Sequence, residues 1–517
     1  MTLRVAMPAL SNLDPVQISR FDSNTRDLVE NLFVGLTRFD PLTRTAEPMI
    51  AQSWTVSDDG LTWSFELRDD IHWVRYDAST QQVVDVRPVQ AGDFVYAIQR
   101  ACDPLRPSPY TENIMLIKGC KVVANAFHEV IDDLFIAREI GVRATGPYSL
   151  EIDLVVPSAY FPSLLASPEL RPLAREAVVN ETAWTGPDTI MTNGPFVLQS
   201  WTASGLSLIR NPFWPDAFTG NIEQVEVTFT DTPAQADMAR LTPEQTAAVS
   251  PDLVKTGPGN TQVMIGFSYD RALVNTTEIR RALALSLDRA ALVNQFLPGR
   301  AQPLDQFTPP DVIAAPEYHG YTSNPTQAQS DFSAAGYPAC ASLPESLLLL
   351  VPDDDPLWIE LANGITAQWQ TQLGCNPALF EVTPLPRTLL IELAHSAYNP
   401  ESVTRSHMWL FVWNADYMDA NAWINDVLHC RYGYLRTGRE CDSADALMDQ
   451  AASATDPQAR ADLYAQAEEL FFGPQGTFPV IPLYQTTASW LQQPWLTNVN
   501  EYGPARYDLW TLAPRAE

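Results

Sequence analysis

The chain has 517 residues, 46% of them hydrophobic, which predicts a large globular protein of two or three lobes. It carries 62 acidic and 32 basic residues, and the net charge of −30 disfavours nucleic acid and anionic lipid surfaces as partners. Apolar runs such as Leu347–Val351 are far shorter than the roughly 20 residues of a membrane helix.

The N-terminal part of the chain predicts a lobe that opens with a strand and a helix. Residues 2–9 (TLRVAMPA) are strand-like, and apolar residues recur at helical spacing over residues 25–36. A β-hairpin is predicted over residues 49–67, where alternating apolar residues surround an Asp-Asp-Gly turn. Residues 91–103 then predict a helix capped by Asp93.

Two alternating runs with a turn between them predict a return to sheet over residues 192–214. From Ile265 onward strands and helices alternate, an order typical of a parallel α/β lobe. The expected elements are one amphipathic helix over 277–297, a buried strand over 346–351, a helix over 356–373, a strand over 378–385, and a last helix and strand over 457–472 and 477–487.

The six cysteines are even in number and lack metal-finger spacing, which predicts three disulfides in an oxidising compartment. Cys340 and Cys375 each precede a strand of the predicted βαβ unit. Parallel neighbours in such a crossover begin at the same sheet edge, so these two thiols are expected to meet. Of the 15 pairings that six cysteines allow, we expect the remaining four to close local loops, Cys102 with Cys120 and Cys430 with Cys441.

No common catalytic motif is present: the chain has no GxSxG elbow, no P-loop, no GxGxxG after a strand and no HExxH. Glu392 and His395 lie three residues apart on a predicted helix, a spacing more typical of a surface pair than of a metal site. Adjacent acids such as Asp58 and Asp59 are typical of turns. We therefore predict no catalytic residue, no metal and no cofactor.

The stretch VWNADYMDANAW, residues 412–423, follows an apolar run that predicts a buried strand. It presents acids, asparagines and aromatics where that strand ends. A loop whose Asp and Asn side chains cap nearby backbone is one explanation. Ligand binding is the other, because acids at the end of a buried strand in an open α/β lobe face the crevice where ligands bind.

The run EPMIAQSWTVSDDGLTWSFELRDDIHW, followed by PVQAGDFVYAIQRACDP, resembles the signature of family 5 extracellular solute-binding proteins of ABC transporters, which include oligopeptide and dipeptide receptors. Further similarities follow in the family's order: SNLDPVQ, TNGPFVL with RNPFW, IRRALALSLDRAALVNQFL, AGYP, WNADY, and ARADLYAQAEELFF with FPVIPLY. They span almost the whole chain.

This resemblance implies an α/β, two-lobed periplasmic-binding-protein-like fold with an additional third domain, of the class II, cluster C type. Domain I, a ligand-binding lobe, is expected at residues 1–46, 188–267 and 481–517. Domain II, packed on it, is expected at 47–187, and domain III, the second lobe, at 268–480. In such proteins the ligand sits between the lobes and is enclosed by hinge closure.

The resemblance also implies a ligand site. In similar oligopeptide-binding members the aspartate of a Trp-x-Ala-Asp-Tyr segment receives the peptide's α-amino group, and Asp416 occupies that position. Trp413, Asn414 and Tyr417 are then expected beside the ligand, and Tyr110 matches a tyrosine that contacts ligand in those members. For the peptide's carboxylate no clear cation is identified, and Arg387 and Arg405 are the candidates.

The sequence thus predicts a non-enzymatic, monomeric receptor that captures a short peptide outside the membrane and delivers it to an ABC permease. We expect it in the periplasm or at the cell surface, with lipid anchoring left open. Because residues 1–10 show no signal-peptide pattern, we expect the export signal to be absent from this sequence. The alternatives are the same role for an oligosaccharide, opine or metal complex, or a sensory or scaffold protein that reuses the fold.

Overall fold

The computed structural model describes residues 1–19, 22–106, 108–109, 111–126, 132–179, 184–318, 320–340, 343–395, 406–435 and 437–515. The chain divides into two compact units. Unit 1 comprises Met1–Gly257, Asp416–Met418 and Ser489–Glu517, and unit 2 comprises Pro258–Ala415 and Asp419–Ala488. Within the described ranges, no helix combines the length and apolar character needed to cross a membrane.

The main sheet of unit 1 is built around β1 (Thr2–Met7), which lies between two parallel neighbours, β12 (Gln224–Phe229) and β13 (Met238–Arg240). Beyond β12 the sheet continues with β11 (Gly205–Arg210) and β10 (Phe196–Thr202), which pair antiparallel. These strands confirm the strand predicted at the N-terminus and the two alternating runs predicted over 192–214.

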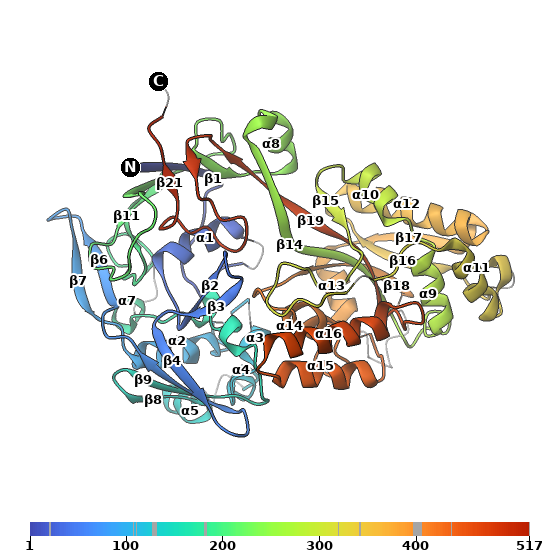
Figure 1. Cartoon of the computed structure of the whole chain (residues 1–517), viewed down its shortest axis with the longest axis horizontal. Coiled ribbons are helices and arrows are strands. Elements are labelled where there is room, and N and C mark those ends of the chain that lie inside the picture. Colours follow the sequence, from blue (N-terminus) through green and yellow to red (C-terminus); the bar gives the residue numbers. More distant parts are fainter. Residues whose placement is uncertain are drawn as a thin grey trace. The chain divides into compact units, whose positions relative to one another are not determined.

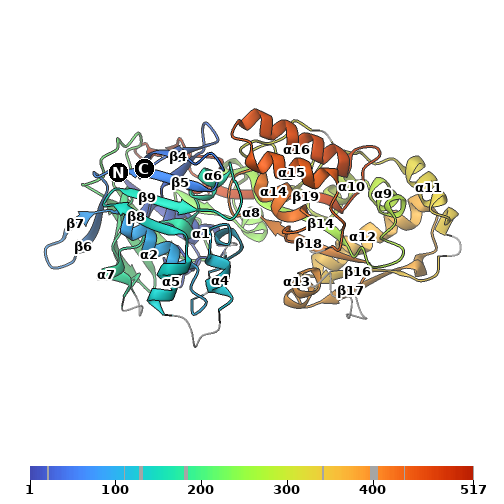
Figure 2. The same ribbon diagram turned by 90° about the horizontal axis from the view of Figure 1, so that it is seen from below.

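A second, four-stranded antiparallel sheet of unit 1 has the order β4, β5, β9, β8, with bounds Ala51–Val56, Thr62–Leu67, Ser149–Asp153 and Val142–Gly146 (Figure 2). Strands β4 and β5 form the predicted hairpin. Helix α2 (Ala91–Ala101) packs against β8. Asp93 is its third residue and accepts the backbone N–H of Gln90 at 2.9 Å, so it caps the first turn from inside the helix.

Helix α1 (Ser23–Leu32) confirms the first predicted helix of unit 1 and buries Leu28 and Leu32. The other elements of the unit are short. They are β2 (Thr37–Asp40), β3 (Thr45–Pro48), β6 (His72–Asp77), β7 (Gln82–Pro88), α3 (Thr111–Ile114), α4 (Cys120–Ala124), α5 (Asp133–Glu139), α6 (Phe161–Leu164), the 3₁₀ helix η2 (Pro168–Leu170), α7 (Arg175–Val178), α8 (Pro243–Ala248), η3 (Pro251–Leu253), β20 (Leu496–Thr497) and β21 (Thr511–Leu512).

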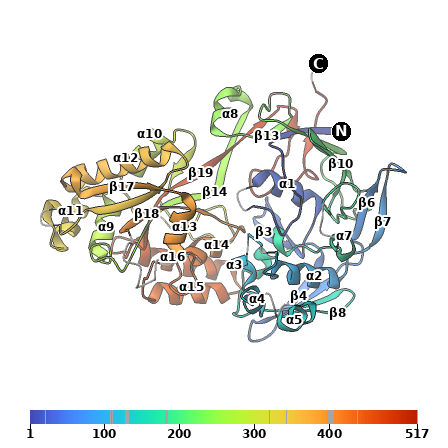
Figure 3. The same cartoon turned by 180° about the vertical axis from the view of Figure 1, so that it is seen from behind.

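Unit 2 contains the predicted βαβ arrangement. Strand β16 (Leu347–Pro352) runs parallel to β17 (Phe380–Leu385), and α12 (Pro356–Leu373) connects them and packs on both. Figure 3 shows α12 beside β17. Strand β18 (Met408–Asn414) pairs parallel with β16 and antiparallel with β14 (Val254–Phe267). The buried strand that precedes the WNADY stretch is therefore central in this sheet.

The single helix predicted over residues 277–297 is wrong: the structure has two helices, α9 (Thr277–Leu285) and α10 (Arg289–Phe296). Asp288 accepts the backbone N–H of Ala291 at 2.9 Å and is the N-cap of α10. An aspartate in that role satisfies a free backbone donor at a helix start, so it favours a new helix over a continuous one.

In the C-terminal part of unit 2, α15 (Ser443–Ser453) and α16 (Pro457–Phe472) lie side by side (Figure 1). Helix α16 confirms the helix predicted over 457–472. The remaining elements are β15 (Ala301–Pro303), α11 (Pro325–Ala334), η4 (Pro338–Cys340), η5 (Pro377–Leu379), α13 (Arg387–His395), α14 (Asn421–Leu428) and β19 (Val480–Gln492).

Two long strands, β14 and β19, each belong to both units, because the chain changes unit at Gly257–Pro258 and at Ala488–Ser489. These positions are several residues away from the changes expected near residues 267 and 481. The three-domain division with its stated bounds stays a prediction, and the separate β4–β5–β9–β8 sheet inside the range expected for domain II is consistent with it.

All six cysteines are paired as expected: Cys102 with Cys120, Cys340 with Cys375 and Cys430 with Cys441. The first pair joins the residue that follows α2 to the start of α4. The second ties the residues that precede β16 and β17, as the shared sheet edge predicted.

Candidate functional site

The residues that follow β18 divide between the two units. Asp416, Tyr417 and Met418 belong to unit 1, whereas the residues on both sides of them belong to unit 2. The segment's start is fixed at Ala415, whose backbone oxygen accepts a hydrogen bond from Asn260 Nδ2 at 2.5 Å. Its end is fixed by Asp419, which is fully buried and bonded to Arg460 of α16.

The carboxylate of Asp416 lies in a buried polar group of unit 1. Asp416 is only 6% exposed. Asn113 of α3 donates from Nδ2 to Asp416 Oδ2 at 3.0 Å, and the same nitrogen lies 3.3 Å from Oε1 of Glu169 in η2. Two carboxylates therefore share one amide donor and are close neighbours.

Glu169 is the less well stabilised of these two carboxylates. It is fully buried. Burial raises its pKa to about 7, and the negative charge of Asp416 adds to that rise, while the positive charge of Arg26 acts in the opposite direction. Its Oε2 is also buried and accepts no hydrogen bond from the described part of the chain. Sequence reasoning did not identify Glu169, since it lies in a short Ser-Pro-Glu-Leu turn without periodicity or motif.

Tyr417, the residue after Asp416, is buried and stacks on Tyr160 of unit 1. The ring centroids are 5.9 Å apart and the planes are inclined by only 12°. Because Tyr417 directly follows Asp416, this segment carries an acid and an aromatic side chain on consecutive residues, and both contact other residues of unit 1. Such a combination suits an organic cation, which a carboxylate attracts and an aromatic face also favours.

Trp413 and Asn414 belong to unit 2. The indole N–H of Trp413 donates to the backbone oxygen of Ala422 at 2.9 Å, and its ring packs on Tyr434 with centroids 5.2 Å apart. Asn414 Oδ1 accepts from the hydroxyl of Thr261 at 2.9 Å. Both side chains thus help to order the end of β18, and their expected contact with ligand stays a prediction.

The remaining predicted site residues are Tyr110 and the two candidate cations. Tyr110 and Arg405 lie outside the described residues. Arg387 forms a bidentate ion pair with Asp354 on the surface of unit 2, with N–O distances of 2.5 and 3.0 Å. A partner for a ligand carboxylate therefore stays unidentified.

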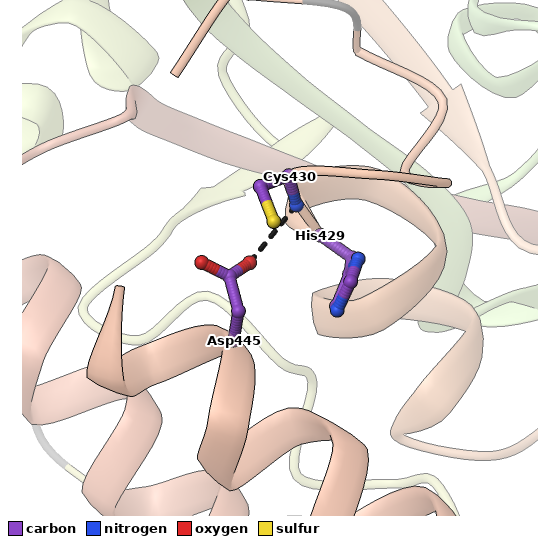
Figure 4. A group of neighbouring side chains, drawn as sticks. All are labelled: His429, Cys430 and Asp445. Atoms are coloured by element: carbon purple, nitrogen blue, oxygen red, sulfur yellow. Dashed lines mark hydrogen bonds between the residues drawn. The ribbon is translucent and has the colours of Figure 1, made fainter. Parts of the chain in front are cut away.

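One group of side chains has the composition of a metal site: His429, Cys430 and Asp445 (Figure 4). Cys430 cannot be a ligand, because its sulfur is bonded to Cys441. The carboxylate of Asp445 accepts hydrogen bonds from the backbone N–H of Cys430 and from Arg439. These contacts give Cys430 and Asp445 a structural role. In the Glu392–His395 pair, Glu392 is exposed, and the side chain of His395 lies outside the described part of the chain.

The sequence profile of bacterial extracellular solute-binding proteins, family 5 (Middle), matches residues 45–434. The chain belongs to this family. It is 28% identical over 515 residues to the periplasmic oligopeptide-binding protein OppA of Escherichia coli K12, covering 94% of this chain and 87% of the relative. It is also 25% identical over 522 residues to the probable deoxycholate-binding periplasmic protein YgiS of the same organism, covering 96% and 90%.

Solved structures show the same fold. The unliganded open form of the murein tripeptide-binding protein MppA matches with a TM-score of 0.78 and 21% identity, covering 99% of this chain and 96% of that one. OppA of Haemophilus influenzae in complex with RPPGFSPFR matches with a TM-score of 0.65 and 21% identity, covering 98% and 97%. The fold expected from the sequence, an α/β periplasmic-binding-protein-like fold, is thereby confirmed.

Proposed function

We propose that this family member is the extracytoplasmic substrate-binding protein of an ABC importer and that it captures short peptides with a free amino terminus. Asp416 binds the peptide's ammonium group, and Tyr417 with Tyr160 forms an aromatic wall beside it. The protein then delivers the peptide to a membrane permease. It acts as a monomeric receptor in the periplasm or at the cell surface and performs no chemistry on its ligand.

The observation that carries this proposal is the buried position of Asp416 next to a second carboxylate. Asn113 donates to both carboxylates but carries no charge of its own. Two neighbouring carboxylates in a buried position favour a cation beside them, and a peptide ammonium is such a cation. Relatives named as oligopeptide-, dipeptide- and murein peptide-binding proteins support the same ligand class.

A second candidate ligand is a bile acid or a similar amphipathic acid, because a relative of comparable similarity is named as a probable deoxycholate-binding protein. The acids at this site argue against it. A ligand whose only charge is a carboxylate would be repelled by Asp416 and by the ionised form of Glu169.

The two candidates separate in one experiment. Native mass spectrometry of protein purified under mild conditions identifies a co-purified ligand by its mass. A series of peptide masses supports the proposal, whereas a single sterol acid, sugar or metal complex refutes it. Calorimetry with trialanine, tetra-alanine and penta-alanine, and separately with deoxycholate, then measures binding to ligand-free protein.

A further inference from the structure

We propose that Glu169 is a second ligand-binding carboxylate: it shares the ligand's cationic amine with Asp416, so that binding of the cation displaces a proton from Glu169 to solvent. This inference rests on the proposed function, because it concerns the amine site of that function. It adds a residue from η2 to the site and makes capture of the ligand dependent on pH.

Glu169 stands apart from most other buried acids among the described residues, which pair with arginine. Examples are Glu30 with Arg171, Asp419 with Arg460, and Asp445 with Arg439. Glu468 of α16 makes no ion pair within the described part of the chain, but its two oxygens accept the backbone N–H groups of Phe307 and Thr308 at 3.0 and 2.8 Å.

Within the described ranges, Oε1 of Glu169 accepts from Asn113 at 3.3 Å and the residue's own backbone N–H also favours the charged form, whereas Oε2 is buried without a hydrogen bond. A buried acceptor without a donor destabilises a fold, so its presence here needs an explanation. The neighbouring Asp416 carboxylate makes the position worse for an anion and better for a cation. An ammonium group has three donors and can bond to both carboxylates at once.

The charges around Glu169 are consistent with this role. Helices α1 and α2 pack against η2. On α2, Asp93 is paired with Arg87 and Arg100 with Asp14. On α1, Asp27 is paired with Arg240 and Glu30 with Arg171 and Arg38. The charges that act on Glu169 are then Asp416, which raises its pKa, and Arg26, which lowers it.

Burial and the charge of Asp416, opposed by Arg26, raise the pKa of Glu169 to about 7 in the free protein. Glu169 is thus largely protonated at pH 5.5 and about half ionised at pH 7. A bound ammonium group favours the ionised form, so it lowers the pKa of Glu169 and releases the proton. Affinity should therefore rise with pH through this range, while the ligand's own amine, with an ordinary pKa of about 8, stays charged.

The test is calorimetry of the alanine peptide that binds wild-type protein most tightly, at pH 5.5 and 7.0, in two buffers of different ionisation enthalpy. For wild type we expect affinity to rise about tenfold between the two pH values and about half a proton to be released per peptide at pH 7.0. For Glu169→Gln we expect less than a twofold change with pH and no proton release. Its affinity at pH 7.0 should also be several-fold lower.

Glu468→Gln is the matched control, because Glu468 is equally buried and its pKa is also raised to about 7 by burial. This variant should bind peptide with the wild-type pH dependence and proton release. If Glu169→Gln behaves like wild type while peptide binding itself is intact, the inference is overturned and the proposed function stands. If no alanine peptide binds wild type, the proposed function fails and the inference fails with it.

Discussion

The sharpest consequence of the site concerns Asp416→Asn. The substitution keeps the size of the side chain and an oxygen that can accept the bond from Asn113, but it removes the charge. It also removes one cause of the raised pKa of Glu169. We therefore expect the folded protein to tolerate the change, with an unfolding free energy close to that of wild type.

The effect on ligand binding should be large because Asp416 is 94% shielded from solvent, its residue being only 6% exposed. Removing one partner of a buried ion pair costs about 3 to 5 kcal/mol, whereas an exposed pair is worth roughly 0 to 1 kcal/mol. At about 1.4 kcal/mol per tenfold, affinity for a free-amine peptide should fall by more than a hundredfold.

The assay is a double-mutant cycle by calorimetry, with wild type and Asp416→Asn each titrated with trialanine and with N-acetyl-trialanine. The acetylated peptide has no ammonium group. It should bind wild type weakly and lose little more on mutation. Equal losses for both peptides, or none for either, would show that Asp416 only caps the loop after β18 and that the reasoning from its burial is wrong.

Three further predictions concern stability. Asp419→Asn should lower the unfolding free energy by about 3 to 5 kcal/mol in chemical denaturation, because it breaks the buried pair with Arg460; a loss under 1 kcal/mol would contradict this. Burial raises the pKa of Glu468 from 4.5 to about 7. Its contribution to the unfolding free energy is therefore fully present below pH 4.5 and is lost as the pH rises through 7. Glu468→Gln should remove about 3 kcal/mol of that decline, seen in melts from pH 4.5 to 8. Replacing Cys340 and Cys375 by serine opens a loop of 35 residues and should cost about 4 kcal/mol, and an unchanged melting temperature would refute it.

Most of the secondary structure could be predicted because its signals are local. The helix over 356–373 appears with the same bounds as α12, since its apolar spacing, the preceding aspartate and the following glycine all agree. The prediction of one helix over 277–297 is wrong because the apolar residues keep helical spacing across Asp288, where the second helix begins. The sequence marks this break only by the capping aspartate itself.

The candidate site was predictable only in part. Asp416 could be identified because a buried strand directly precedes it and because its segment resembles a family motif. Asn113 and Asp416 are 303 residues apart, and Asn113 and Glu169 are 56 apart, so no spacing rule connects them. Each lies in a short element, α3, η2 or the loop after β18, where periodicity carries no information.

What identifies Glu169 is a balance of charges that exists only in the folded chain. The sequence has almost twice as many acids as bases, so an unpaired acid is unremarkable in it. In the structure the buried acids with arginine partners explain where many of the scarce cations are used. A fully buried glutamate beside a second carboxylate, with no arginine partner in the described part of the chain, is then an exception that needs a cause. A cationic ligand that binds reversibly is such a cause, because its positive charge stabilises both carboxylates while it is bound.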